Sequence, residues 1–469
     1  MLLFSCSDDI TNLNEDIKNP STVPAEYLFS NAQKSLVDQM TSTNVNNNVF
    51  RLFVQNWTET VYTDESNYDI ATRTIPDNHW NAIYRDVLKD LAESRKILES
   101  EVNSGTPQEI DVKTNKIAEI DILTAYCYSV LVDTFGDIPY TEALDIENHP
   151  NPKYDDAETI YRDLLSKLTA SVNSLVIGSD SFEDADLIYG GDVAKWKMFA
   201  NSLRLKLAIN LDDVDHTYAT AEALAAVTSG VISSSSSNAA LKYLSTQPNT
   251  NPIFVDVVAS GRDDFVPTST IIDKMNALND PRMSSFFTQV GGIYEGGTPG
   301  DGNTFDNFSH IGTSILEPTF EALLFDYSEV EFLLAEAVER GIAVGGTAST
   351  HYTNAVTASL NYWNVSSTNI SAYLSQPTVA YGTATGNWKQ KIGEQSYLAL
   401  YNRGFETWTS YRRLDFPVLT APTDAAISEV PKRYTYPARE QTLNSSNNTA
   451  ASAAIGGDEM TTKLFWDKF

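Results

Sequence analysis

The sequence predicts an all-α protein in which amphipathic helices pack in pairs, with an irregular, loop-rich second region. Three observations lead to this fold class. Apolar residues recur at spacings of three and four over long stretches, which places them along one face of a helix. Capping residues, glycines and prolines bound these stretches. From Ser233 to Gly312 the periodicity weakens while Gly, Asn, Pro and Ser concentrate, which is typical of loops.

Composition narrows the function. The chain has 469 residues, enough to bury a substantial core, and no apolar run approaches the ~20 residues needed to cross a bilayer. Acidic residues number 62 against 32 basic ones, giving a formal charge of -30. Such a surface repels phosphate backbones, so we expect no nucleic-acid partner. Two cysteines provide no disulfide framework, and Cys127 lies on an apolar helix face as an expected core residue.

The first residues form a separate segment. An apolar run ends in Ser5 and Cys6, and two acidic residues, Asp8 and Asp9, follow closely. This pattern resembles a bacterial lipobox, in which the cysteine thiol is acylated and the chain is cut before it. Several acyl chains together anchor a protein stably. The run is too short for a complete signal peptide, so we expect a truncated start, with residues 1–24 as signal remnant and tether. The alternative is an incidental cysteine in a disordered tail.

The first half of the chain predicts long helices joined by short turns. The predicted helices cover residues 24–40, 49–62, 80–98, 107–135 and 157–176. Asp192 is placed to cap a further helix that continues through Leu207. Pairing of long helices across short turns indicates tetratricopeptide-like units, although the strict repeat consensus is absent.

A second helical pair follows the loop-rich stretch. A capping box at Ser328 and Glu331 predicts a helix that ends at Gly341, and residues 350–363 predict its partner. We therefore place helical pairs at about 25–212 and 325–365. The loop-rich, ligand-facing region is expected at about 213–324 and 366–469, all within one domain over 25–469.

Residues 133–140 are predicted to form an ordered turn between two helices. The apolar face of the preceding helix runs up to this stretch, Gly136 supplies the backbone freedom that a helix C-terminus needs, and Pro139 forbids continuation. An ordered loop that carries Asp137 and Tyr140 should follow.

Several segments of the chain, taken in order, carry a family resemblance. They are 135–143 (FGDIPYTEA), 189–205 (YGGDVAKW to ANSLRL), 280–282 (DPR), 329–341 (EVEFLLAEAVERG), 404–413 (GFETWTSYRR) and 431–447 (beginning PKRYTYP). Together they resemble the SusD/RagB-like outer-membrane nutrient-binding lipoproteins over nearly the whole chain. Thr435 departs from the family pattern, which has proline there.

The resemblance implies a SusD-like helical fold and a surface lipoprotein of the outer membrane, attached through a lipid on Cys6. In this family, acidic residues after the cysteine accompany export to the cell surface, and Asp8 and Asp9 match. It also implies a partner, a SusC-like TonB-dependent transporter, which such a lipoprotein covers as a lid. The expected ligand is a glycan, held between the two proteins and released inward.

Catalytic and metal-binding signatures are absent from the sequence. There is no Gly-x-Ser-x-Gly elbow and no His-Glu-x-x-His, and the five histidines lack ligand spacing. Asp301, Asn303 and Asp306 could offer oxygens to calcium but depart from EF-hand spacing. We therefore expect no enzyme activity, no metal and no cofactor.

Two loops qualify as ligand-binding segments, because aromatic faces beside amide and carboxylate groups suit a polar, uncharged ligand. Trp80 also fits the apolar face of a helix, which favours a core position over ligand contact. The candidate contacts are Tyr62, Asp64, Tyr68 and Trp80 in the first loop and Tyr294, Phe305, Asn307 and Phe308 in the second.

Three alternatives remain at this point. Within the same family, the ligand could be an oligopeptide. A secreted glycoside hydrolase would need a carboxylate pair, which sequence cannot select among 62 acidic residues. A helical-repeat scaffold would bind only protein.

Overall fold

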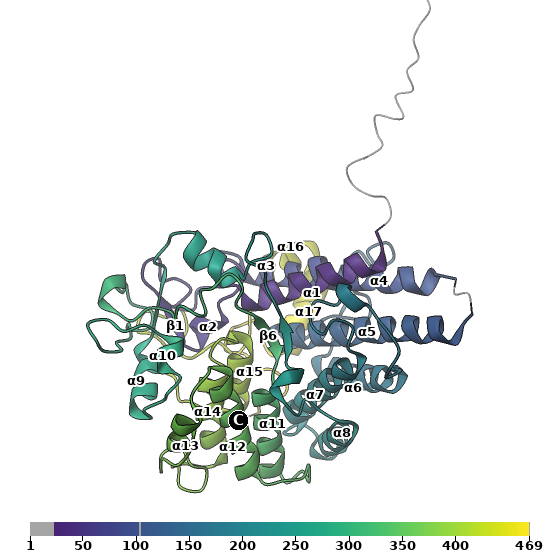
Figure 1. Ribbon diagram of the computed structural model, residues 1–469. Coiled ribbons are helices and arrows are strands. Elements are labelled where there is room, and N and C mark those ends of the chain that lie inside the picture. Colours follow the sequence, from purple (N-terminus) through teal and green to yellow (C-terminus); the bar gives the residue numbers. More distant parts are fainter. Residues whose placement is uncertain (1–22, 103–104, 469) are drawn as a thin grey trace, which may run out of the picture.

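The computed structural model describes residues 23–102 and 105–468. Helices make up most of this part of the chain, accompanied by three two-stranded sheets, as Figure 1 shows. The expected all-α class is confirmed. Cys6, Asp8 and Asp9 lie outside the described residues. No helix within the described ranges has the length and apolar character required to span a membrane.

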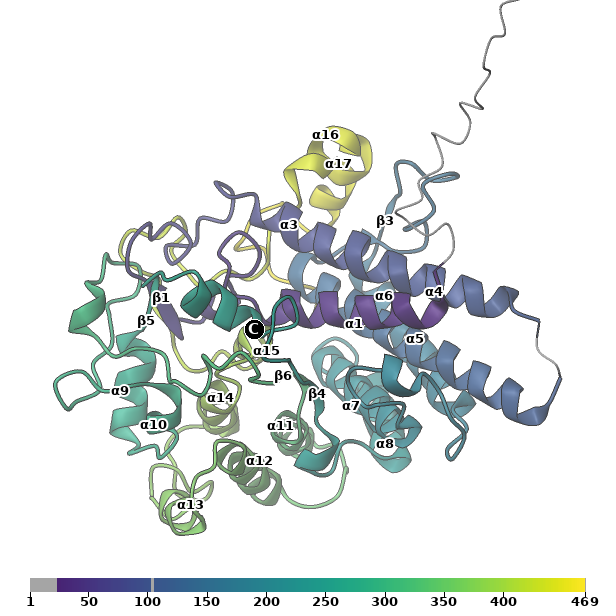
Figure 2. The ribbon, with the colours of Figure 1, turned by 45° about the horizontal axis from the view of Figure 1, so that its top comes forward.

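The first half of the chain packs as helical pairs. The segments α3, η2 and α4 follow one another directly, and α1 packs against η2 and α4. Helix α5 then pairs with α6, and α7 pairs with α8 (Figures 1 and 2). The bounds are α1 Ala25–Thr41, α3 Ile75–Asn81, the π-helical η2 Ala82–Leu88, α4 Lys89–Ser100, α5 Pro107–Phe135, α6 Ala157–Ser174, α7 Val193–Leu211 and α8 His216–Ser229. Helix α8 extends the pairing beyond the boundary expected at residue 212.

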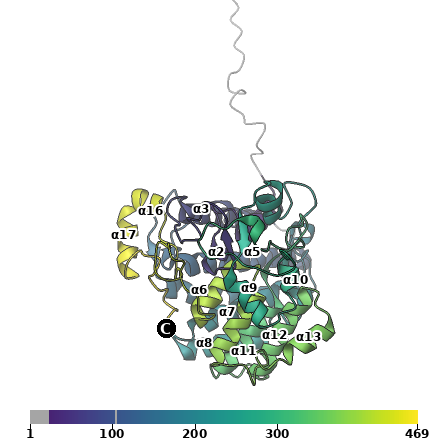
Figure 3. The ribbon, with the colours of Figure 1, turned by 90° about the vertical axis from the view of Figure 1, so that its left-hand side faces the viewer.

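The second half adds further helices, of which Figure 3 shows α9 to α13 toward the lower right and α16 and α17 apart on the left. Helix α11 pairs with α12, and α14 packs on α11, α12 and α15. The bounds are α9 Ser269–Ala277, α10 Met283–Phe286, α11 Tyr327–Glu339, α12 Ala348–Tyr362, α13 Ser367–Leu374, α14 Trp388–Ala399, α15 Gly404–Leu414, α16 Ala438–Leu443 and α17 Ser445–Ala454.

Short strands and single helical turns join distant parts of the chain. The antiparallel pairs are β1 Trp57–Glu59 with β5 Phe265–Pro267, β2 Ile138–Pro139 with β3 Tyr154–Asp155, and β4 Ala239–Leu241 with β6 Ala322–Phe325. The turns are η3 Glu183–Ala185, η4 Ser235–Ser237, η5 Phe254–Ala259 and η6 Phe305–Asn307.

Two local predictions are wrong. The helix expected over 49–62 reduces to α2, Phe50–Phe53, because Gln55 takes a left-handed conformation (φ 54°) and the next residues pair with β5 instead. The cap of α11 is Asp326, whose side chain accepts a hydrogen bond from the Glu329 amide, not Ser328. By contrast, α5 has the predicted bounds, and Asp192 caps α7 as expected.

The end of α5 is held by the C-terminal segment of the chain. Gly136 ends the helix with φ 86° and leaves the last carbonyl groups without helical partners. The Arg433 guanidinium donates twice to the Phe135 carbonyl, at 3.0 and 2.8 Å. Arg412 donates to the Asp133 carbonyl at 2.6 Å. Two buried cations thus satisfy carbonyls at the negative end of the helix dipole.

An aromatic cluster connects this helix end to the start of the chain. The Tyr434 ring meets the Phe135 ring edge-on and stacks on Phe50, with centroids 5.9 and 5.2 Å apart. The Trp408 ring also stacks on Phe50, at 5.2 Å, and its centroid lies 6.0 Å from that of Tyr434. Such pairs add about 0.5–1.5 kcal/mol each beyond area burial. Helix α2, and β1 after it, are therefore positioned by residues from the last quarter of the chain.

Buried ions connect the two helical groups. Lys206 of α7 is paired with Glu406 of α15 and, at 3.1 Å, with Glu329 of α11. Arg403 donates to Glu329 at 2.6 Å and to Asp326 at 3.2 Å. Removing one partner from such a network leaves an uncompensated charge, which typically costs about 3–5 kcal/mol.

Replacing Arg433 by Ala tests the role of the α5 terminus. We expect a loss of about 3–5 kcal/mol in the free energy of unfolding, because the Phe135 carbonyl and the Asp458 carboxylate lose a buried partner. Denaturant titration measures it. Arg439→Ala, six residues on and exposed, is the control and should stay within about 0.5 kcal/mol of wild type. Equal stability of both variants would contradict the assignment.

Candidate functional site

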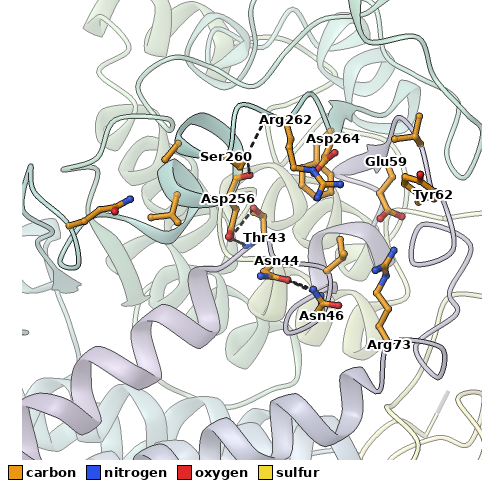
Figure 4. Close-up of a pocket in the computed structure, with 16 residues that line it drawn as sticks. Thr43, Asn44, Asn46, Glu59, Tyr62, Arg73, Asp256, Ser260, Arg262 and Asp264 are labelled. Carbon is orange, nitrogen blue, oxygen red and sulfur yellow. Dashed lines mark hydrogen bonds and ion pairs between the residues drawn. The ribbon is translucent and has the colours of Figure 1, made fainter.

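A cavity of about 450 Å³ opens where the end of α1, the β1–β5 pair and η5 meet (Figure 4). This volume lies within the range typical of small-ligand sites. Its lining combines an exposed aromatic and several apolar side chains with amides, carboxylates and guanidiniums. The lining residues are Thr43, Asn44, Val45, Asn46, Glu59, Val61, Tyr62, Arg73, Gln247, Val255, Asp256, Ala259, Ser260, Arg262, Asp264 and Phe265.

Strand pairing builds the floor of this cavity. Glu59 of β1 lies opposite Phe265 of β5, and the Phe265 ring packs against the buried Trp57. The Trp57 indole in turn donates to the Tyr401 hydroxyl at 2.7 Å. Because these rings are buried, the floor is a rigid surface on which the loops above it are carried.

Tyr62 stands at the rim of the cavity. Its side chain is 71% exposed, and its neighbour Val61 is also exposed. The Tyr62 backbone has φ 56°, a left-handed conformation that costs a non-glycine residue roughly 1–2 kcal/mol. A large apolar ring is therefore held in water, at a strained position, beside a polar cavity. This combination points to a ligand contact rather than to packing.

The arginines of the cavity are paired with carboxylates. Arg262 contacts Asp264 at 2.8 Å, and Arg73 contacts Glu65, just behind the lining, at 2.5 Å. Asp256 accepts hydrogen bonds from the Ser42 hydroxyl at 2.9 Å and the Thr43 amide at 3.0 Å. Little net charge remains in the cavity of a chain whose formal charge is -30.

Glu59 lies in the lining as a neutral group at pH 7. Burial and the neighbouring Glu65 raise the pKa of Glu59 to about 8, and the two carboxyl groups share a hydrogen bond. One oxygen of Glu59 accepts from the Ser66 amide at 2.9 Å and the Ser66 hydroxyl at 3.0 Å. Two buried carboxyl groups this close cannot both ionise without a large electrostatic cost. The protonated Glu59 therefore donates its hydrogen bond to Glu65.

The first predicted loop is split between cavity, surface and core. Tyr62 lines the cavity, and Asp64 is exposed. Ligand contact by Tyr68 is contradicted, because the ring is fully buried and its hydroxyl accepts from the Gln55 amide at 3.1 Å. Trp80 is also a core residue. It is buried on α3 and packs edge-on against Phe135 at 5.0 Å.

The second predicted loop lies outside the cavity lining. Tyr294 is half-buried against the core, and Phe305 stacks on His310 with ring centroids 3.8 Å apart. Phe308 is half-buried and Asn307 is exposed. The loop touches the first through the Asn67 amide, which donates to the Gly300 carbonyl at 2.8 Å. Ligand contacts by these four residues stay predictions.

Sequence reasoning missed most of the cavity. Arg262 and Asp264 come from a segment read only as loop, and Asn44 and Asn46 from an expected turn. A charged pair flanked by Gly261 and Phe265 was the available signal. Metal ligation finds no support, since the described residues contain no group of three or more metal-binding side chains. The Asn303 amide instead bonds to Thr298.

Comparison with known proteins identifies the family. Residues 17–437 match a family model, SusD-like, described as starch-binding and associating with the outer membrane. This chain belongs to the SusD-like family. Members of this family are binding proteins rather than enzymes. No curated protein matches the sequence significantly.

Solved structures of SusD-like proteins share the fold. A chitin-binding protein is 26% identical, with 95% of this chain and 100% of that one covered and a TM-score of 0.81. A SusD homolog from Bacteroides uniformis is also 26% identical, with coverage of 94% and 100% and a TM-score of 0.80. A chitin-binding SusD homolog from Flavobacterium johnsoniae is 22% identical, with coverage of 94% and 97% and a TM-score of 0.76.

The protonation state of Glu59 gives a pH prediction. In the unfolded chain Glu59 titrates near its ordinary pKa of about 4.3, but in the folded protein it keeps its proton to about pH 8. Its contribution to stability is therefore complete at low pH and is lost as pH rises through 8. Glu59→Gln removes this titration while its amide preserves the hydrogen bonds. We expect the melting temperature of Glu59→Gln to rise relative to wild type between about pH 4 and 8, the interval between the two pKa values, and to stay level above it.

Glu93→Gln is the matched control for this experiment, because its side chain is 52% exposed. Its melting temperature should follow wild type across the same range. A Glu59→Gln difference that stays constant with pH would show that Glu59 is ionised throughout.

Proposed function

We propose that this SusD-like protein is a surface-exposed outer-membrane lipoprotein that captures glycans for import through a SusC-like TonB-dependent transporter. The observation that carries the glycan assignment is Tyr62, an exposed aromatic face at the rim of a polar cavity with little net charge. The description of the family as starch-binding and the chitin-binding relative at 26% identity support the same ligand class.

The chemistry of the cavity suits a neutral sugar chain. A pyranose ring offers an apolar C–H face and a rim of hydroxyls that both donate and accept. Tyr62, Val61 and Val255 present exposed apolar surface to such a face. Around them, amides and paired arginines supply directed hydrogen bonds. A pocket for an apolar ligand would lack these amide and guanidinium groups around the apolar side chains.

The charge balance favours a glycan over a peptide. A cationic peptide would gain most from unpaired carboxylates, but Asp264 is already paired with Arg262, and Glu59 is protonated. Among the described residues, Asp256 alone of the lining carboxylates is ionised without a cationic partner within ion-pair distance. An anionic peptide would need free arginines, and Arg73 is engaged by Glu65. Hydroxyl groups need no net charge of either sign. We therefore expect the cavity to bind glycans in preference to peptides, and the binding test below includes both.

The ligand class is tested by Tyr62→Ala. Affinity electrophoresis against a polysaccharide panel, beside calorimetry with oligopeptides, identifies what wild type binds. Loss of the aromatic platform should then lower glycan affinity about 5- to 100-fold, as expected for removal of about 1–3 kcal/mol of contact energy. Tyr62→Trp should retain binding, because it keeps an aromatic face.

Tyr27→Ala provides the control. Tyr27 is 67% exposed at the far end of α1, outside the cavity lining, so its removal should leave affinity unchanged. Unchanged glycan affinity in Tyr62→Ala would remove this cavity from the proposal. If wild type binds oligopeptides and no glycan, the ligand class is oligopeptides and the glycan proposal is wrong.

Attachment and partner are tested together in membranes. With Cys6 acylated, the protein should fractionate with the outer membrane, stay accessible to external protease, and co-purify with a TonB-dependent transporter after mild detergent extraction. Cys6→Ala should move it to the soluble fraction. Membrane attachment that survives Cys6→Ala would rule out the lipid anchor at this residue.

A further inference from the structure

A second, polar cavity of about 630 Å³ lies beside the first. The two share three lining residues, Asn44, Val255 and Asp256, so they adjoin at these residues. The other residues that line the second cavity are Ser35, Asp38, Gln39, Ser42, Asn47, Asn78, Asn81, Ala82, Arg85, Asp86, Pro248, Thr250, Pro252 and Arg439.

One stretch of chain borders both cavities. Residues 247–264 supply Gln247, Arg262 and Asp264 to the first cavity and Pro248 and Pro252 to the second. The opposite side consists of the end of α1 and the turn after it, followed by α3 and η2 at the second cavity. Figure 4 shows this arrangement at the junction, with Asp256 and Ser260 facing Thr43 and Asn44.

Asp256 occupies the junction with one oxygen in use. Its Oδ2 accepts from the Ser42 hydroxyl, the Thr43 amide and, more weakly, the Thr43 hydroxyl. These bonds connect η5 to the end of α1 at the place where the two cavities adjoin. Its Oδ1 receives no hydrogen bond from the described residues and is available to a hydroxyl that passes through the junction.

The second cavity repeats the chemistry of the first without its aromatic. The side chains of Asn47 and Asn81 are half-buried and make no hydrogen bond within the described part of the chain. The NH2 donor and the carbonyl acceptor of each amide are therefore available to a ligand. The ion pair of Arg85 with Asp86, at 2.7 Å, again cancels charge. Amides on a charge-balanced surface suit the hydroxyls of a neutral glycan.

We infer that the two cavities form one continuous groove that binds an extended internal stretch of a neutral, linear glycan, with Tyr62 at one end and Asn81 at the other. This inference rests on the proposed function, because it assigns a length and a direction to the same ligand. A short oligosaccharide fills the Tyr62 end alone. A longer one crosses Asp256 and gains the amide contacts of the second cavity.

Chain-length dependence of binding tests the groove. Calorimetry with starch-derived and chitin-derived oligosaccharide ladders, from the disaccharide upward, should show affinity that keeps rising beyond the trisaccharide, by about tenfold or more in total, at one glycan per protein for the longest members. Asn81→Ala and Arg439→Ala should reduce affinity for long members by several-fold and leave short members unchanged. Tyr62→Ala should weaken both.

The outcomes separate this inference from the proposed function. A plateau at the trisaccharide, or far-end variants that bind long members as wild type does, would overturn the groove while glycan capture at Tyr62 stands. Two long oligosaccharides bound per protein would likewise mean two separate sites. Absence of binding to the polysaccharide panel and to both ladders would overturn the proposed function and the groove together. Urea titration of Asn81→Ala should give the same free energy of unfolding as wild type, which shows that a change in affinity does not come from loss of folding.

Discussion

The C-terminal end of α5 is the constraint on which the rest of the structure depends. A helix of 29 residues ends in the protein interior, where water cannot satisfy its last carbonyl groups. An unsatisfied buried acceptor costs about 1–3 kcal/mol, so the fold must bring donors to this point. Arg433, 298 residues beyond Phe135, and Arg412, 279 residues beyond Asp133, provide them. Three of the segments that resemble the family signatures, 135–143, 404–413 and 431–447, therefore meet at this helix end.

That same convergence positions the candidate site. Tyr434 and Trp408, brought to the end of α5 by the C-terminal segment, stack on Phe50 and so fix α2. Strand β1 follows within a few residues and carries Glu59 into the cavity floor, where β5 pairs with it. The binding surface is therefore irregular backbone carried on a rigid, aromatic-filled framework, which lets the loops vary without disturbing the fold. The buried ion pairs of Lys206 and Arg403, and that of Arg282 with Asp280, involve none of the residues that line the cavity.

The helices were predictable because each carries its own signal. Apolar spacing, Thr106 before Pro107 and Gly136 at the other end define α5 without reference to any partner. The helix predicted over 49–62 was wrong because the apolar residues of this stretch fit a helix as well as they fit a short helix followed by a strand. The left-handed backbone of Gln55 and the pairing of β1 with β5, more than 200 residues away, decide between these two structures. Tyr68 and Trp80 failed as ligand contacts for a related reason. An aromatic residue in a loop has the same local signature whether its ring faces water or the core, and only Tyr62 of the three faces water.

The sequence by itself determined the helical class and the family, since periodicity and ordered motifs are properties of the chain read in one dimension. The tertiary structure alone decided which loops meet and which rings are exposed. It also decided how the charges of the site cancel, because Arg73 finds Glu65, Arg262 finds Asp264 and Asp256 reaches Ser42 across 214 residues. A binding surface made of side chains from separate loops has no linear pattern, since its members need only be near one another after the core has closed.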